Sequence, residues 1–274
     1  MELKKVETLA EVKAAFEGIE ENGDEWFSNL LARDDELTRW IEKGQVSVAA
    51  TPTTALLLRQ RYGCQRLYFA NVKLGTLAED LKSCLAGIPE KVITTVLERD
   101  GESQAIKNAI CSAAFSHYEL LKYAMKINEP QSPSPQGLDF AQSTDAASID
   151  AIIKENFDPL LDQNPDSDEI MDAIENKRVL VARDTENKQA VAFISFERIG
   201  KTLWSRYMAT LQDYRKNAPY GALLLYQLLG LHSDAQRIVG WIRHDNAISR
   251  GMYQALGFQC DGLSTEEYFL YSAE

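Results

Sequence analysis

The pattern of apolar and polar positions is clearest in the second half of the chain. Alternating runs rich in Val, Ile, Phe and Tyr predict three consecutive strands, and two turn-rich breaks separate them. Longer apolar-periodic stretches predict helices on either side. In chain order the expected elements are a strand at 138–143, helices at 144–157 and 166–177, strands at 178–184, 189–198 and 202–211, a helix at 218–233, a strand at 236–244, a helix from 246, and a strand at 265–272 with a short extra strand at 258–262.

The first half repeats this order from residue 35 onward. The pattern predicts strands at 54–63 and 65–74, a helix at 76–88, a strand at 91–100, a helix at 103–115 and a strand at 118–127. The segment 35–50, "DELTRWIEKGQVSVAA", precedes them and has a counterpart at 168–183, "DEIMDAIENKRVLVAR". Seven of these sixteen positions are identical without a gap, at an offset of 133 (168 − 35). The matching segment and the matching order predict an internal duplication.

Between the halves lies "NEPQSPSPQG", residues 128–137, with three prolines, two serines and a glycine. Proline removes a backbone donor and restricts the residue before it, so this stretch predicts a linker. We therefore expect two domains, at 1–130 and 138–274. Each should be an α+β domain, with helices flanking a mixed, mostly antiparallel sheet.

Composition narrows the class of protein. With 45% apolar and 26% charged residues, the chain has the make-up of an ordinary globular protein. A net charge of −12 argues against nucleic acid as a partner, because phosphate binding needs clustered Lys and Arg. No apolar run approaches the roughly 18 residues that cross a bilayer, and the first residues do not read as a signal peptide. We expect no membrane partner and a cytoplasmic location.

The four cysteines and three histidines favour neither a metal site nor a disulfide framework. They are scattered, with no C-x-x-C pair and no spacing typical of zinc ligands. The chain also contains no Gly-x-x-x-x-Gly-Lys-Ser/Thr phosphate loop and no Gly-x-Ser-x-Gly nucleophile turn. We therefore expect no metal cofactor, and neither a nucleotide-hydrolysing nor a serine-hydrolase mechanism.

One short stretch has a distinctive arrangement, "HDNAISRGMYQALGF". Asn246 opens a predicted helix, Tyr253 follows on it, and Gly257 with Phe258 ends it. Asn is a favoured N-cap and glycine adopts the left-handed conformation that ends helices. Placed directly after a strand, this pattern resembles the last helix of the GCN5-related N-acetyltransferases. The resemblance covers the whole second half and implies the fold of that family, with acetyl-CoA as co-substrate.

In that family a turn with the pattern Arg/Gln-x-x-Gly-x-Gly/Ala leads into a helix, and its amides hold the pyrophosphate of coenzyme A. Backbone N–H groups and the helix dipole favour anions at such a position. Here the stretch is "RKNAPYGA", with Ala218 and Tyr220 where glycines are expected. By resemblance the cofactor-binding residues are Leu211, Arg215, Lys216, Asn217, Ala218, Tyr220, Gly221, Ala222, Asn246 and Tyr253.

The reaction implied is transfer of an acetyl or other acyl group to a primary amine of a small molecule or peptide. The leaving thiolate needs a proton, and the phenol of Tyr253 is the expected donor. Glu197 is the candidate base, and His244 a candidate relay. The simpler interpretation of Tyr253 is a packed core residue, and that of Glu197 and His244 a solvated strand-end charge and a structural histidine.

The first half lacks the corresponding tyrosine and pyrophosphate-binding turn. Ile110 and Cys111 stand where a tyrosine is expected, and no Arg-x-x-Gly-x-Gly precedes the helix at 76–88. We therefore expect a degenerate first copy that takes no cofactor. A second functional class also fits the sequence: a non-catalytic binding or regulatory protein that keeps the fold and has lost the pyrophosphate turn.

Overall fold

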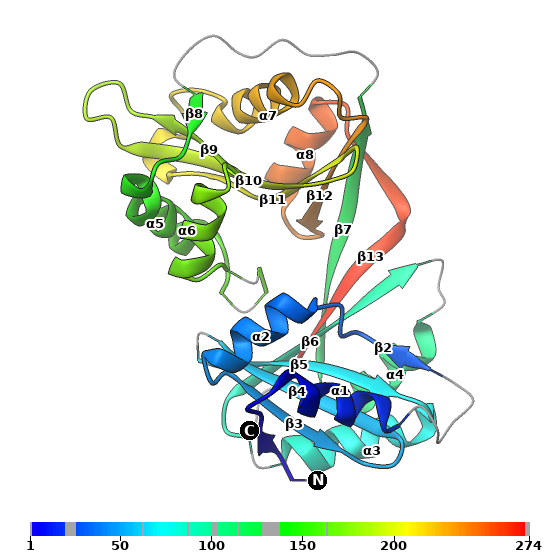
Figure 1. Cartoon of the computed structure of the whole chain (residues 1–274). Coiled ribbons are helices and arrows are strands. Elements are labelled where there is room, and N and C mark those ends of the chain that lie inside the picture. The colour runs from blue at the N-terminus through cyan, green and yellow to red at the C-terminus, as the bar shows by residue number, and fades with distance from the viewer. Residues whose placement is uncertain are drawn as a thin grey trace. The chain divides into compact units, whose positions relative to one another are not determined.

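The computed structural model describes residues 2–19, 26–61, 63–86, 88–99, 103–113, 115–127, 138–159, 161–162 and 164–271. They fall into two compact units (Figure 1). Unit 1 is Met1–Leu120 with Leu263–Glu274, and unit 2 is Leu121–Gly262. The expected linker at 128–137 lies outside the described residues.

Unit 1 is built on a sheet with the strand order β1-β3-β4-β5-β6-β13. Neighbouring strands are antiparallel except β5 and β6, which run parallel, and the short β2 pairs with the end of β5. Its strands are β1 (Lys4–Lys5), β2 (Phe27–Ser28), β3 (Val46–Ala50), β4 (Thr54–Arg61), β5 (Cys64–Asn71), β6 (Lys91–Arg99) and β7 (Ser116–Lys126). Its helices are α1 (Leu9–Glu17), α2 (Asp34–Glu42), α3 (Leu74–Leu85) and α4 (Gln104–Ser112).

Unit 2 repeats this plan with the order β7-β12-β11-β10-β9-β8. Strands β11 and β12 run parallel, whereas β10 is antiparallel to both β11 and β9, and β9 is antiparallel to β8. The strands are β8 (Leu138–Phe140), β9 (Val179–Arg183), β10 (Ala190–Ile199), β11 (Thr202–Thr210), β12 (Arg237–Arg243) and β13 (Gln259–Tyr271). The helices are α5 (Ala146–Asn156), α6 (Ser167–Glu175), α7 (Tyr220–Leu231) and α8 (Ala247–Ala255).

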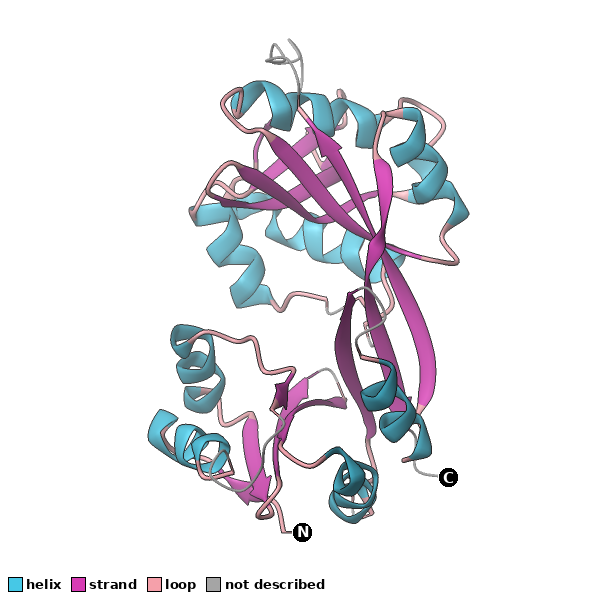
Figure 2. Cartoon of the chain, turned by 90° about the vertical axis from the view of Figure 1, so that its right-hand side faces the viewer, coloured by secondary structure: helices cyan, strands magenta, loops and turns pink. Residues whose placement is uncertain are grey.

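Alternation along the strands gives each sheet two apolar faces, and helices cover both (Figure 2). On β4, Leu56 and Leu58 pack against α3 and α4, whereas Ala55 and Leu57 pack against α1 and α2. In unit 2 the core on one face holds residues of α7 and α8, and the core on the other holds residues of α5 and α6. The expected mixed sheet flanked by helices, present twice, is confirmed.

Two strands divide their residues between the units. In β7 the residues from 121 onward belong to unit 2, and in β13 the residues from 263 onward belong to unit 1. The sheet of each unit is thus completed by a strand from the other half of the sequence. The units therefore cut across the continuous halves 1–130 and 138–274 that the sequence suggests.

The offset of 133 also holds in three dimensions. Strands β3 and β9 are each the second strand from the outer edge, next to β1 and β8. The turns before them contain Gly44 (φ 65°) and Lys177 (φ 53°), which are 133 positions apart. The backbone N–H of Arg33 donates to Glu36 at the start of α2, as that of Asp166 does to Glu169 at the start of α6. This repetition of caps and turns supports the duplication.

Two local expectations need correction, and three elements of the structure were not expected. The helix expected at 144–157 begins later, at Ala146, because a short 3₁₀ turn at Ser143–Asp145 precedes it and Asp145 takes the N-cap position. The strands expected at 258–262 and 265–272 are one continuous strand, β13. The elements β1, α1 and β2 precede the segment from which the repeat was deduced, and the pattern did not predict them.

Candidate functional site

The parallel strands of unit 2 part from each other halfway along. Pairing of β11 with β12 covers Thr202–Ser205 against Arg237–Gly240, and β11 then continues to Thr210. On its other side β11 has a β-bulge: Ser205 and Tyr207 pair with successive residues of β10, so that Arg206 is the extra residue. The bulge thus lies where the two strands separate.

The hydroxyl of Tyr253 lies at this point of separation. It is 3.4 Å from the hydroxyl of Ser205 on β11. On β12, a Cβ added to Gly240 would lie 3.1 Å from the same oxygen. Tyr253 is 5% exposed. Burial raises the pKa of Tyr253 above its ordinary value, because the phenolate would lose its hydration, and the hydrogen bond with Ser205 offsets this only in part.

Helix α8, which presents Tyr253, begins and ends as its sequence predicts. The side chain of Asn246 accepts a hydrogen bond from the backbone N–H of Ser249 (3.0 Å), so Asn246 is the N-cap. Gly257 has a φ of 89° just after the helix, a conformation that costs glycine little. Phe258 is buried, and its ring meets that of Tyr253 at 4.6 Å between centroids.

The start of α7 meets β11 and α8 beyond the bulge. A Cβ built on Gly221 would lie 3.1 Å from the sulfur of Met252 and 3.5 Å from that of Met208. The three residues come from α7, α8 and β11. These elements approach one another closely at Gly221, because glycine has no side chain to keep them apart. In the described part of the chain, the N–H groups of Gly221 and Ala222 donate to no protein acceptor. They are two of the four amides that any helix leaves open at its N-terminus.

The remaining residues expected to hold the cofactor lie along the connection from β11 to α7. Leu211 is partly buried against the core that α5 and α6 cover. Arg215 donates to the carbonyl of Thr210 (3.3 Å) and to Asn156 (2.5 Å), and its neighbours Lys216 and Asn217 are exposed. Ala218 precedes Pro219, the N-cap of α7, and the ring of Tyr220 packs against the core beneath α7 and α8.

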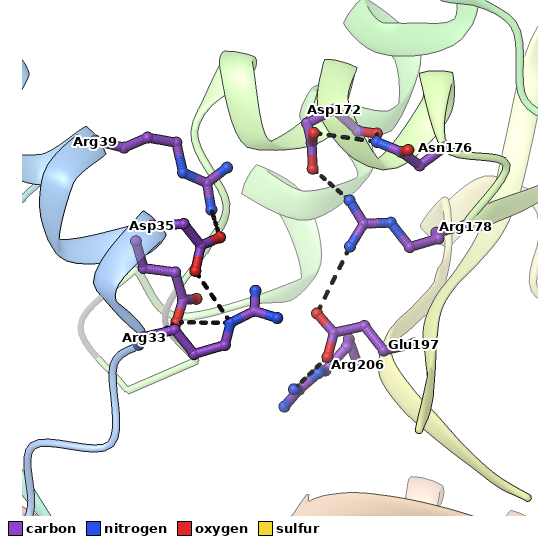
Figure 3. Close-up of polar contacts among 9 residues, drawn as sticks. Arg33, Asp35, Arg39, Asp172, Asn176, Arg178, Glu197 and Arg206 are labelled. Atoms are coloured by element: carbon purple, nitrogen blue, oxygen red, sulfur yellow. Dashed lines mark hydrogen bonds and ion pairs between the residues drawn. The ribbon is translucent and has the colours of Figure 1, made fainter. Parts of the chain in front are cut away.

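Glu197 belongs to a different cluster (Figure 3). Its carboxylate accepts a hydrogen bond from Arg206 (2.6 Å), and its other oxygen lies 3.9 Å from Arg178. Arg178 in turn is paired with Asp172 on α6. This chain of ion pairs lies on the α6 side of the sheet, whereas Tyr253 packs on the side of α7. The structure therefore does not bring the two expected catalytic side chains together.

The corresponding gap in unit 1 is filled by the protein itself. Pairing of β5 with β6 ends at Leu67 and Thr94. Asn29, just after β2, lies there and is buried. Its amide donates to the Thr94 hydroxyl (2.9 Å) and the Thr95 carbonyl (2.8 Å), and its side-chain oxygen accepts from the N–H of Phe69 (2.6 Å).

Two further differences separate the copies. Strand β5 pairs with β4 without a register shift, so unit 1 has no counterpart of the bulge at Arg206. Only residues 72 and 73 join β5 to α3, whereas residues 211–219 join β11 to α7. In α4 the fully buried Ile110 stands where unit 2 has Tyr253. Unit 1 therefore offers neither the hydroxyl nor a connection long enough to surround a phosphate.

Sequence reasoning missed Ser205 and Gly240 in the site of unit 2 and Asn29 in unit 1. Gly240 carried a usable signal, since a glycine inside a strand pattern marks a close approach of another group. Ser205 and Asn29 carried none, because their neighbours at the site are distant in sequence.

Other classes of site find no support in the described residues. No group of three or more His, Cys, Asp or Glu side chains there is placed to hold a metal ion. The helices described are too short or too polar for any of them to traverse a bilayer.

The chain was compared with known families, curated proteins and solved structures. No family model matches it, and no curated protein does. A tandem GNAT protein from the clavulanic acid biosynthesis pathway has a similar structure, with a TM-score of 0.62, 12% identity, and coverage of 100% of this chain and 99% of that one. A GCN5-related N-acetyltransferase from Sphaerobacter thermophilus gives 0.60 at 14% identity, over 98% and 95%. A probable N-acyltransferase from Enterococcus faecalis gives 0.59 at 10%, over 98% and 71%.

These structures are similar to this chain over both units. The chain therefore has the fold of the GCN5-related N-acetyltransferases, present twice in tandem.

Proposed function

We propose that unit 2 is an acyl-CoA-dependent N-acyltransferase that transfers an acetyl or other acyl group to a primary amine of a small molecule or peptide. One observation carries the proposal: the Tyr253 hydroxyl sits where β11 and β12 part, beside the bulge. A weakly acidic hydroxyl at the end of the gap between the strands can donate a proton to the thiolate that leaves the thioester.

The start of α7 is the proposed site for the pyrophosphate of coenzyme A. The N–H groups of Gly221 and Ala222 and the helix dipole favour an anion there. The exposed Lys216 adds positive charge, and Arg215, Asn217 and Ala218 line the same connection. Tyr220 is compatible with this role because its ring packs into the core. The convergence of Met208, Gly221 and Met252 supports a path for the pantetheine arm from α7 toward Tyr253.

The proposed reaction is direct attack. The neutral amine nitrogen bonds to the thioester carbon, giving a tetrahedral oxyanion that the backbone N–H groups of β11 near the bulge stabilise. The nitrogen, positively charged after the attack, releases one proton to solvent. The carbon–sulfur bond then breaks as the oxyanion re-forms the carbonyl, and the sulfur takes the proton of Tyr253. The phenol regains a proton from solvent. The raised pKa of Tyr253 keeps the phenol protonated at neutral pH, the form that this step requires.

The base that deprotonates the amine stays a prediction. Glu197 is the candidate from the sequence, and its two arginine neighbours compete for its carboxylate. If Glu197 acts as the base, Glu197→Gln should flatten the acid limb of the profile of kcat/KM against pH. An unchanged acid limb would remove Glu197 from the mechanism and leave it a partner of Arg206.

Titration calorimetry with acetyl-CoA tests the proposal. We expect one acetyl-CoA per chain, because Asn29 fills the gap of unit 1. Gly221→Glu should abolish binding through charge repulsion and loss of space, whereas Gly75→Glu at the start of α3, where the structure is open, should leave it intact. No binding to the wild type at about millimolar acetyl-CoA would contradict the enzyme and favour a non-catalytic binding protein of the same fold.

A further inference from the structure

Tyr123 is encoded in the first half of the sequence but lies in the core of unit 2. It stands on β7, next to β12 in the strand order, and it is 1% exposed. The backbone N–H of Ile127, just past the end of β7, donates to the carbonyl of Gln236 (2.9 Å), the residue before β12. Its place in the sheet is therefore fixed by backbone pairing as well as by burial.

Tyr123 makes two contacts with α8. The Nε of Arg250 donates to its hydroxyl (3.3 Å), and its ring meets the ring of Tyr253 edge to face, with 6.4 Å between centroids. Arg250 and Tyr253 are three residues apart on the helix and thus share a face. Arg250 also donates through Nη1 to the carbonyl of His244 (2.7 Å), just before the helix begins.

These contacts restrain two features that set the position of the Tyr253 hydroxyl: the start of helix α8 and the tilt of the Tyr253 ring. The guanidinium is planar with its donors in a fixed fork, so bonds to Tyr123 and to His244 restrain the start of α8 together. The edge-to-face contact restrains the tilt of the Tyr253 ring. The other contacts of the Tyr253 ring are the 3.4 Å contact with Ser205, the packing of Phe258 and the close approach of Gly240, and none of them restrains the start of α8.

We propose that Tyr123 is a positioning residue for Tyr253, so that a strand of the first copy completes the active site of the second. This inference rests on the proposed function. It gives the degenerate copy a role: it binds no acyl-CoA itself and supplies the side chain that orients the proton donor. Because Tyr123 does not touch the substrate, its loss should lower turnover more than affinity.

The test is a double-mutant cycle in the full chain. Thiol release from acetyl-CoA is measured with the amine that gives the fastest wild-type turnover among amino acids, polyamines and lysine peptides. We expect Tyr123→Phe to lower kcat by roughly tenfold, since small misplacements of a reacting group can cost about 10²-fold, and to change the KM for acetyl-CoA little. In the Tyr253→Phe background, Tyr123→Phe should have no further effect. Tyr68→Phe, in unit 1, is the matched control and should leave kcat unchanged.

Additive losses of kcat, or an unchanged kcat in Tyr123→Phe, would overturn the inference. A second measurement separates this outcome from failure of the proposed function. With tyrosines labelled at Cζ, the NMR resonance of Tyr253 should shift in Tyr123→Phe and should stay in place in Tyr68→Phe. This holds even if no amine is acetylated. An unmoved Tyr253 resonance overturns the positioning role, whereas a shifted resonance in a chain that acetylates no amine overturns only the proposed function.

Discussion

Tyr253 combines deep burial with a hydroxyl at the proposed active site. Its ring packs edge to face on Phe258 and Tyr123, and its oxygen lies 3.4 Å from the hydroxyl of Ser205. Such a ring would keep its place without the hydroxyl. The structural and catalytic roles of Tyr253 can therefore be separated by removing the oxygen alone.

We expect Tyr253→Phe to lower kcat by about 10²–10⁴-fold, the usual worth of general acid help. The free energy of unfolding should change by only about 1 kcal/mol, because one hydrogen bond is lost and the ring remains. Steady-state kinetics and urea unfolding measure the two effects. The exposed Tyr226 on α7 provides the control, since Tyr226→Phe should alter neither.

The pH profile adds a check on the same residue. Because burial raises the pKa of Tyr253 above its ordinary value, the proton-donating form persists through neutral and mildly alkaline pH. Loss of kcat caused by ionisation of Tyr253 should thus occur at a higher pH than the ionisation of an exposed tyrosine. A Tyr253→Phe variant with near wild-type turnover, or an alkaline loss of kcat below pH 9 that this variant abolishes, would contradict the assignment.

Gly240 gives a second prediction at this scale. A methyl group there would lie 3.1 Å from the Tyr253 hydroxyl and 3.2 Å from a ring carbon, so Gly240→Ala must push the ring away. We expect kcat to fall by at least about tenfold, with a loss of stability of about 1–3 kcal/mol from overpacking. Gly251→Ala on α8 is the control: nothing lies near its added methyl, and alanine favours the helix. Equal activity of the two variants would show that the hydroxyl needs no fixed place.

At the scale of elements, the two copies use the same turn with different residues. Gly44 and Lys177 both have positive φ between a helix and the next strand. For a lysine this conformation costs about 1 kcal/mol or more of conformational free energy, because its Cβ crowds the backbone. Lys177→Gly should therefore raise the free energy of unfolding by roughly 0.5–1 kcal/mol. Lys154→Gly, inside α5, should lower it by about the same amount. Destabilisation by Lys177→Gly in urea unfolding would show that the lysine side chain matters more than its backbone.

The β2 segment supplies the second prediction at this scale. Asn29→Ala removes the partners of the Phe69 N–H and the Thr95 carbonyl in a buried gap, which should cost about 2–4 kcal/mol of stability. Asn108→Ala, at an exposed position on α4, should cost far less. Acetyl-CoA stoichiometry should stay at one per chain, because unit 1 lacks the long connection before α3. A second bound equivalent in Asn29→Ala would mean that Asn29 alone closes unit 1.

At the scale of the whole molecule, each unit depends on a strand from the other half of the sequence. Residues 121–127 complete the sheet of unit 2, and residues 263–271 complete that of unit 1. A chain cut between the halves should for this reason remain together, because neither piece holds all strands of one sheet.

A protease site placed within residues 128–137 tests this. After cleavage, the pieces should co-elute in gel filtration and keep any activity that the intact chain has. They should separate only when urea unfolds both. The uncut protein carrying the same insertion is the control. Separation of the pieces in plain buffer would show that the shared strands contribute little to either unit.

Much of the fold followed from the sequence because its signals are local. Alternation along 179–183 and 190–198, the cap at Asn246 and the stop at Gly257 each act within a few residues, and each appears where expected. The tandem repeat was visible for the same reason, since 35–50 and 168–183 keep the same caps and turn at one offset. The proposed proton donor was found through this local pattern too.

The tertiary structure alone decided which strands share a sheet and which side chains meet. Alternation of apolar and polar residues identifies the two faces of a strand but not the strand beside it. The placing of β7 residues in unit 2 and of β13 residues in unit 1 was therefore not predictable. The bulge at Arg206 depends on the register with β10, which no local pattern reveals. Glu197 belongs to ion pairs on the α6 side of the sheet, whereas Tyr253 packs on the α7 side. Asn29 with Thr94, and Tyr123 with Arg250 and Tyr253, meet only because chain segments far apart in sequence pair edge to edge.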